Sequence, residues 1–338
     1  MSFRVVAPLA VKILPPSSFR LPPLAAAALI ALAPAALAAD APYPVKPARI
    51  VVAFVPGGAT DILGRLLSAR FQENLGQPFP VENRAGAGGT IGAEIVAKSP
   101  PDGYVLLMTS ASLTVNVTLY PNTSYNARKD LAPIVHVASS PLVLTTHPSV
   151  PAKSVKELVA LSKKRKDGLN FATNGAGTTS HLAAVMLSQM SGFNITQIHY
   201  KGSGGAQIAL VSGEADVGFP AVTSGRPHIA AGRLKGLAIS TKRKSSVLPD
   251  LPTVDSMYPG FDIDNWFALF APAGTPQSVI TKLHAEAVKG LQHPDMQAWI
   301  KREGAEPVGN STAEFTKFFN SEIEKFAKIV KASGAKPD

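Results

Sequence analysis

Residues 49–61, RIVVAFVPGGATD, join a short apolar run to a glycine-rich turn and the beginning of a helix. The run 50–55 has the length and composition of a buried strand, and Gly57 and Gly58 let the backbone turn without a side chain in the way. Residues 59–61 then stand where unpaired amides and the positive end of a helix dipole favour a carboxylate or phosphate. The pattern predicts an anion-binding turn, although any strand-to-helix turn of an α/β protein shares its form.

Two further junctions of this kind follow in the chain. The first, residues 170–181 (NFATNGAGTTSH), has glycines at 175 and 177 and then three hydroxyl side chains. The second, residues 200–205 (YKGSGG), precedes a short helical stretch. If the turn at 57–61 belongs to one lobe and these two belong to another, all three can close on a single small anion from opposite sides.

Several nearby polar residues allow more than one role. Asp61 can cap a helix, receive the amino group of a ligand or be solvated. Arg84 can pair with a ligand carboxylate through both guanidinium nitrogens or fix a surface loop. Three residues after an expected strand at 104–108 are either hydrogen-bond donors to a ligand or ordinary loop residues: Ser110, Ser112 and Asn116.

Catalytic and metal chemistry find little support in the sequence. A pairing of His181 with Ser180 or Ser110 is disfavoured, because adjacent helical residues do not face each other and no G-x-S-x-G motif is present. The other histidines lack the spacing of metal ligands. Glycines at 86, 88 and 92 resemble a dinucleotide-binding run, but no clear strand precedes them and no acidic ribose partner follows. We expect neither a cofactor nor a metal.

The N-terminal residues predict export. Residues 1–38 carry three basic residues, an Ala/Leu-rich run and a closing Ala-Leu-Ala, which is the pattern of a cleaved secretory signal peptide. Its removal would lower the net charge from +10 to +7, which favours anionic ligands. The basic residues are scattered, and the densest cluster, 163–166, falls at the end of an expected helix, so nucleic acid is excluded as a partner. The chain has no Cys, and stability must therefore come from core burial.

Strand-like and helix-like segments alternate through the rest of the chain, which predicts an α/β fold. Capping boxes at 154–157 and 311–314 and Pro276 mark helix starts. Glycines at 76, 192, 213 and 304 mark helix ends. Five further segments read as strands: 104–108, 142–145, 169–172, 215–219 and 234–239.

The spacing of these elements favours two lobes. Extended stretches at 133–148 and 262–272 can both cross between lobes, so that the chain leaves the first lobe and later returns to it. The expected division is a first lobe at 43–141, a second lobe at 142–250 and a return to the first lobe at 251–338.

The sequence resembles the Bug family, the TctC-like extracytoplasmic solute receptors of tripartite tricarboxylate transport systems. The resemblance covers essentially the whole mature chain and rests on eight motifs together: 55–61, 81–92, 99–104, 175–182, 200–202, 213–216, 251–253 and 271–276. It departs from the family at 127–129, where an Asp-Pro is common, and at 219–221, where a small or polar residue is usual and Pro220 can reshape the pocket wall.

The resemblance implies a periplasmic-binding-protein fold of type II, with two α/β lobes, a hinge and a ligand cleft between them. Such receptors hold a carboxylate through backbone amides, hydroxyls and waters, on loops that match 56–61 and 175–181. The expected ligand-binding residues combine these loops with apolar walls and one strand end: Phe54, Gly58, Ala59, Thr60, Asp61, Ser110, Gly177, Thr178, Thr179, Ser180 and Phe219.

The expected function is that of a monomeric periplasmic receptor, not an enzyme. It would capture a small organic anion, which is a di- or tricarboxylate, an amino acid or an aromatic acid, and deliver it to the membrane subunits of a transporter. The alternatives are an exported α/β hydrolase, which would lose turnover when one nucleophile is replaced, and a ligand-sensing partner of a signalling receptor.

Overall fold

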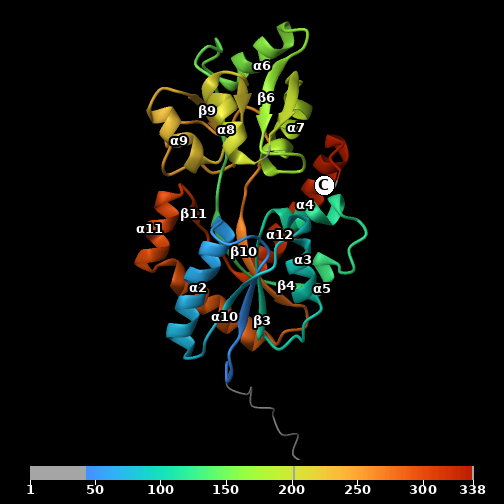
Figure 1. Ribbon diagram of the computed structural model, residues 1–338, viewed down its shortest axis with the longest axis vertical. Helices are drawn as coiled ribbons and strands as arrows, with labels where there is room; N and C mark the ends of the chain where they lie inside the picture. Colours follow the sequence, from blue (N-terminus) through green and yellow to red (C-terminus); the bar gives the residue numbers. More distant parts are fainter. Residues whose placement is uncertain (1–42, 201, 337–338) are drawn as a thin grey trace, which may run out of the picture. The chain divides into compact units, whose positions relative to one another are not determined.

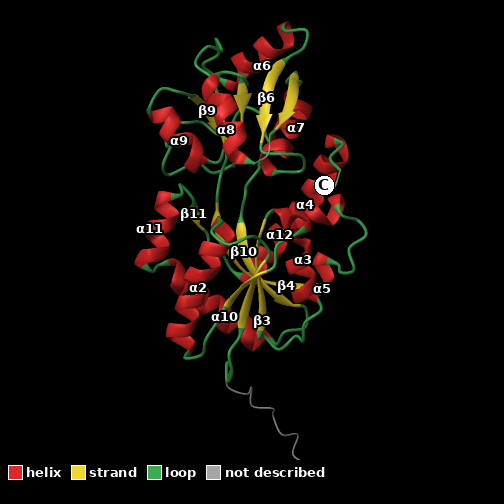
Figure 2. Cartoon of the chain, viewed as in Figure 1, coloured by secondary structure: helices red, strands yellow, loops and turns green. Residues whose placement is uncertain are grey.

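The computed structural model describes residues 43–200 and 202–336, and the predicted signal peptide at 1–38 lies outside them. The described chain forms a six-stranded sheet with strand order β11-β4-β10-β3-β1-β2 and a five-stranded sheet with order β7-β6-β8-β5-β9. Within these residues, no helix is long and apolar enough to cross a membrane. The alternation of strands and helices confirms the predicted α/β class (Figure 2).

The six-stranded sheet draws its strands from both ends of the chain. Its strands are β1 (Arg49–Val52), β2 (Val81–Asn83), β3 (Val105–Ser110), β4 (Leu131–Ser139), β10 (Phe267–Pro272) and β11 (Glu306–Pro307). β2, β1 and β3 are mutually parallel, whereas β10 runs antiparallel to both of its neighbours. The helices around this sheet are α2 (Ala59–Leu75), α3 (Thr90–Ala97), α4 (Ser112–Leu119), α5 (Ala127–Asp130), α10 (Gln277–Leu291), α11 (Pro294–Arg302) and α12 (Thr312–Ser333), with a 3-10 turn η1 (Ala87–Gly89).

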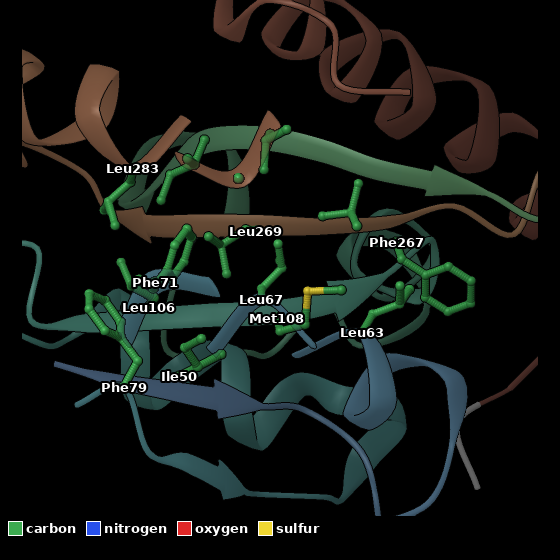
Figure 3. Packing of buried hydrophobic residues seen from close by; sticks show 14 of the residues in the cluster. Ile50, Leu63, Leu67, Phe71, Phe79, Leu106, Met108, Phe267, Leu269 and Leu283 are labelled. Atoms are coloured by element: carbon green, nitrogen blue, oxygen red, sulfur yellow. The ribbon is translucent and has the colours of Figure 1, made fainter. Parts of the chain in front are cut away.

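Both faces of this sheet are buried, as the side-chain alternation of its strands requires. Ile50 and Val52 face a core that α2 and α10 complete, whereas Val51 between them faces the core on the α3 and α12 side. Figure 1 shows α2 beside α10. Figure 3 shows the first core, in which side chains of α2 pack on the strands: Leu63, Leu67 and Phe71 against Leu106, Met108 and Leu269.

The five-stranded sheet comes from one continuous part of the chain. Its strands are β5 (Val143–Thr146), β6 (Leu169–Thr173), β7 (Ile195–His199), β8 (Val217–Gly218) and β9 (Lys235–Ile239), and its helices are α6 (Val155–Lys164), α7 (Thr179–Ser191), α8 (Ser203–Ser212) and α9 (Val222–Ala230). β6 is parallel to β7 and β8, and β5 is antiparallel to β8 and β9. The strands of this sheet all lie between the predicted lobe boundaries at 141 and 250, and the strands of the first sheet lie outside them. The exact boundaries stay a prediction.

Most local predictions of helix ends agree with the structure. Ser154 and Ser311 accept hydrogen bonds from backbone N–H groups of the first turn, and Ser311 forms a complete capping box with Glu314. Gly76, Gly192 and Gly213 end their helices in the left-handed conformation. Gly304 is also left-handed but lies two residues beyond the end of α11, after the C-cap residue Glu303.

The predicted strand at 50–55 is wrong at its end, because β1 stops at Val52. The pairing partner β2 ends at Asn83, and Asn83 then donates its side-chain amide to the Phe54 carbonyl at 3.0 Å. The apolar run continues to Val55, but Val55 is 64% exposed. Hydrophobic composition alone therefore overestimates the length of the strand.

Two segments connect the two sheets side by side. The first follows β4 and the second precedes β10, and Ser140 in the first donates its N–H to Asp264 Oδ1 in the second at 3.0 Å. Pro141 and Asp264 form an antiparallel bridge at the same place. The long helix α12 adds a third connection, because Phe315 and Phe319 belong to the core of the first sheet and Phe326 to that of the second.

Candidate functional site

The parallel strands bring three loops to one edge of each sheet. β2, β1 and β3 run in the same direction, so the loops after Asn83, Val52 and Ser110 leave from a common edge. β6, β7 and β8 do the same in the second sheet. Ligands of open α/β sheets bind at the carboxyl ends of strands, and these two edges carry all three glycine-rich junctions.

The first turn of α2 is left without a side-chain cap. Its N-cap is Gly58, whose extended backbone makes no side-chain capping hydrogen bond. The first turn of a helix has N–H groups with no intrahelical acceptor, and here these belong to Ala59, Thr60 and Asp61. Helix α2 begins at Ala59, so residues 59–61 form its first turn, where the sequence predicts them.

Asp61 stabilises this turn from within. Its Oδ2 accepts hydrogen bonds from the Gly57 N–H at 2.9 Å and from Arg65 Nε at 3.0 Å, and its Oδ1 accepts one from Asn83 Nδ2 at 2.9 Å. Burial by itself would raise the pKa of Asp61, but the hydrogen bonds from Arg65, Gly57 and Asn83 hold that pKa below its usual value. Of the three roles open to Asp61, turn stabilisation is the one for which the structure supplies partners.

The glycine loop after β2 packs against Phe54, in the loop that precedes α2. The Asn116 side-chain amide donates to the Gly88 carbonyl at 2.9 Å and contacts Thr90 Oγ1 at 3.2 Å. Gly89 has φ +99°, and a Cβ at that position would lie 3.2 Å from Cζ of Phe54. Asn116 therefore holds the loop, and the half-buried Phe54 ring lies against it.

Arg84 and Ser110 make local contacts. Arg84 Nε donates to Glu82 Oε1 at 2.6 Å, and the Arg84 side chain is half exposed. This is the surface-loop role of Arg84. Ser110 lies at the end of β3, almost buried, with its Oγ 3.2 Å from Ser112 Oγ.

The first turn of α7 is braced by His181. The Gly177 N–H donates to His181 Nδ1 at 2.9 Å, and Thr178, the N-cap, accepts from the His181 N–H at 3.4 Å while donating to the Gly175 carbonyl at 2.7 Å. Burial and the neighbouring His199 lower the pKa of His181 to about 4. The ring is therefore neutral near pH 7, with Nδ1 as the acceptor. The sequence offered a signal for this brace, since Gly177 and His181 have the same spacing as Gly57 and Asp61.

The hydroxyl groups of Thr179 and Ser180 have different surroundings from the hydroxyl group of Thr178. Thr178 has its hydroxyl proton committed to Gly175. Ser180 is 1% exposed, and its Oγ has no hydrogen-bond partner among the described residues. Thr179 is half-buried at the first helical position. A buried hydroxyl without a partner is unusual and indicates a place where a further polar group is needed.

The third junction lies against the second. Gly202, the N-cap of α8, has φ +86° and makes no side-chain cap. Its N–H donates to the Asn174 carbonyl at 3.1 Å. The loops after β6 and β7 are thereby joined, and the structure places two glycine-rich helix starts at one edge of the second sheet.

A chain of contacts leads from one edge to the other through α4. A Cβ at Gly177, where φ is +72°, would lie 3.0 Å from Cδ2 of Leu119. Leu119 is one turn after Asn116 on α4, and Asn116 holds the glycine loop that touches Phe54. Side-chain packing and the Asn116 hydrogen bond thus connect the loop that begins α7 to the region where α2 begins.

Phe219 lies in a different environment from that expected. The ring is 1% exposed and packs against Phe261, with ring centroids 6.0 Å apart, and against Phe171, also at 6.0 Å. All three belong to the hydrophobic core of the second sheet. A ring buried this completely has almost no surface left for a ligand, so we do not retain Phe219 as a pocket wall.

His181 does not form the serine pairing that the sequence disfavours. His181 Nδ1 is occupied by the Gly177 N–H, and its ring packs at 4.9 Å on that of His199 instead of pairing with Ser180 or Ser110. Among residues 43–200 and 202–336, no cluster of His, Asp or Glu could hold a metal ion.

Comparison with known proteins gives similarity over nearly the whole described chain. The family described as "Tripartite tricarboxylate transporter family receptor" (TctC) matches residues 63–335. Protein BugT of Bordetella pertussis (strain Tohama I) is 39% identical over 300 residues, which cover 87% of this chain and 91% of that protein.

Two solved structures are similar in fold as well as in sequence. Rhodopseudomonas palustris Rpa4515 with adipate is 31% identical, with a TM-score of 0.72, and the match covers 88% of this chain and 100% of that one. MatC (Rpa3494) from R. palustris with bound malate is 31% identical, with a TM-score of 0.68, and the match covers 85% of this chain and 100% of that one. These similarities confirm the two-lobed α/β fold expected from the sequence.

Proposed function

The chain belongs to the tripartite tricarboxylate transporter receptor family (TctC), and from that premise we propose that it captures a small organic dicarboxylate between the first turns of α2 and α7. The chain would then deliver this ligand to the membrane subunits of a transporter. The solute-binding role follows from the family. The ligand class, the residues and the delivery step are our proposal.

The observation that carries the proposal is the uncapped first turn of α2. Three consecutive N–H groups there, at residues 59–61, have no capping side chain. Oriented amides at a helix N-terminus bind carboxylates through charge-assisted hydrogen bonds and the helix dipole. Asp61 does not occupy these groups, because its carboxylate is directed to Gly57, Arg65 and Asn83.

The first turn of α7 supplies the second half of the proposed site. The N–H groups of Thr179 and Ser180 and the Thr179 hydroxyl are its proposed donors. Gly58 and Gly177 keep side chains away from the ligand, Thr178 fixes the turn, and Phe54 forms an apolar wall. Ser110 would add a hydroxyl at the end of β3.

A ligand with two carboxylates would place one against the first turn of α2 and the other against the first turn of α7. The relatives solved with adipate and malate hold molecules with a carboxylate at each end, which supports a dicarboxylate here. When the lobes close, solvent is excluded and the hydrogen bonds to the carboxylates strengthen. Oriented amides thus replace the water that surrounded the ligand.

The place of action in this proposal is the periplasm. Family relatives include solved periplasmic proteins, and residues 1–38 have the pattern of a signal peptide. Expression of the full chain and N-terminal sequencing of the secreted product tests this part. Cleavage after about residue 38 is expected, and a product that retains Met1 would oppose it.

Calorimetric titration tests the ligand class. The purified protein, shown by mass spectrometry after denaturation to carry no co-purified molecule, is titrated with malate, succinate, adipate, citrate, benzoate and glutamate. We expect saturable 1:1 binding of at least one dicarboxylate without product formation. Binding of none of these acids would contradict the proposal, and turnover of any of them would favour a hydrolase.

A further inference from the structure

A cavity of about 420 Å³ lies beside the two segments that connect the sheets. It is lined by Ser139 at the end of β4, Pro141 of the first segment and Asp264 of the second, together with the loop after β9 and the edge strand β11. None of its lining residues belongs to the first turns of α2 and α7. Its volume is within the range of small-molecule sites, about 300–1,000 Å³.

A buried imidazole without a partner lines this cavity. His136 on β4 is 3% exposed, and its Nε2 makes no hydrogen bond in the described structure. Its other ring nitrogen is engaged with the backbone of Ala138, while burial lowers the pKa of His136 to about 3. The ring is therefore neutral, and Nε2 is an acceptor that needs a donor.

Three further side chains that line the cavity offer acceptors. Asn310 Oδ1 is buried without a hydrogen-bond partner among the described residues. Among the described residues, the Asp262 side chain accepts only the Lys242 N–H, at 3.2 Å, and the Glu306 side chain accepts only the Ser246 N–H, at 2.8 Å. Together with His136 these groups form an acceptor-rich inner wall, which suits an ammonium group.

The outer side of the cavity is cationic. Lys242, Arg243 and Lys244 follow β9 in sequence, line the cavity and are exposed. In the part of the chain that the structure describes, none of the three makes an ion pair. Three cations without ion pairs favour an anionic ligand. They favour a ligand with two carboxylates over a ligand with one.

We propose that this cavity binds an acidic amino acid, with the ammonium against His136 and Asn310 and the carboxylates against Lys242, Arg243 and Lys244. The inner wall comes from the first sheet and its return segment, and the cations come from the second sheet. A ligand here therefore contacts both lobes beside their connections. The site is separate from the carboxylate site proposed above and does not depend on it.

The test compares L-glutamate with glutarate, which has the same two carboxylates but no ammonium. Binding is measured by calorimetry on the wild type, on the triple variant K242A/R243A/K244A, and on K163A/K164A/K166A, which removes a matched set of exposed charges at the end of α6. We expect the first triple variant to weaken L-glutamate binding at least tenfold and the second to leave it unchanged. Glutarate affinity should be the same in all three proteins.

A second variant tests the inner wall without altering net charge. Asn310→Leu removes one acceptor, and we expect it to weaken L-glutamate binding while glutarate is unaffected. The proposal would be overturned if the wild type did not bind L-glutamate, if K242A/R243A/K244A bound it as tightly as the wild type does, or if an excess of a dicarboxylate displaced it competitively.

Discussion

Gly177 donates its backbone N–H to Nδ1 of His181, 2.9 Å away and four residues later in the chain. Gly57 and Asp61 repeat this relationship at the same spacing and the same distance in the other sheet. In each case a residue in the first helical turn accepts the N–H of the preceding loop and fixes the loop. The amides that follow the N-cap are then left for another partner.

Replacement of His181 tests this brace. His181→Leu removes the acceptor of the Gly177 N–H and should destabilise the protein by about 1–3 kcal/mol and weaken carboxylate binding. His181→Asn places an oxygen near the position of Nδ1 and should restore most of both. Urea unfolding and calorimetry measure the two effects. Equal losses in the two variants would contradict the brace.

The pH dependence of stability provides an independent test of His181. Its pKa is about 4 in the folded protein, below the ordinary value of a histidine, so the unfolded chain binds more protons between these values. The free energy of unfolding should therefore fall as the pH is lowered from about 6.5 toward 4. His181→Asn should reduce this slope, and identical slopes in the variant and the wild type would contradict the prediction.

Asp61 should contribute stability that depends on its negative charge. Asp61→Ala removes an acceptor that Gly57, Arg65 and Asn83 share and should cost about 1–3 kcal/mol. Because the pKa of Asp61 is lowered in the folded state, the contribution is present above the ordinary pKa and is lost as the pH falls through the folded value. Glu73→Gln, which removes an exposed carboxylate, serves as the control. A pH-independent difference between Asp61→Ala and the wild type would argue against the network.

Asp264 should make the protein less stable as the pH rises, which is the opposite of the effect expected for Asp61. Burial raises its pKa to about 7, with Asp262 and Glu322 adding repulsion and Ser139 and Ser140 partly opposing it. The folded state then binds more protons than the unfolded chain between about pH 4 and 7, so stability falls as the pH rises over that range. Asp264→Asn keeps an acceptor for the Ser140 N–H and should remove this decline. Unfolding curves from pH 4 to 8 measure it, and an unchanged slope in the variant would oppose this role.

Phe219 and Phe54 should respond differently to truncation. Phe219→Ala removes a ring from a closed core and should destabilise the protein by about 3–5 kcal/mol. Phe54→Ala, at a half-buried ring, should cost less stability but weaken carboxylate binding. If Phe219→Ala folds as stably as the wild type and loses only affinity, the ring faces the ligand after all.

The sequence predicted the helix starts at Ser154 and Ser311 and the glycine helix ends because these depend on local backbone chemistry. It also placed the glycine-rich helix starts at 57–61 and 175–181. It could not predict that β1 stops at Val52, because this depends on pairing with β2 and on the Asn83 side chain.

Long-range packing accounts for the other differences. Phe219 follows a strand and looked available to a ligand, but Phe261 and Phe171, distant in sequence, cover it. The cavity lined by His136, Asn310 and Lys242 likewise draws on residues more than 170 positions apart. No local pattern identifies such a set.

The central claim is that the first turns of α2 and α7 hold the same ligand through their backbone amides. Proline at the first position of a helix removes one N–H and is compatible with the extended backbone of Gly58 and Thr178. Ala59→Pro and Thr179→Pro delete one donor in each lobe, Thr179→Ala isolates the hydroxyl, and Gln277→Pro makes the same change at α10. Calorimetric titration with the tightest dicarboxylate should show a loss of about 10–100-fold for each of the first two prolines and none for Gln277→Pro. If either Ala59→Pro or Thr179→Pro binds as tightly as the wild type, the two turns do not share a ligand.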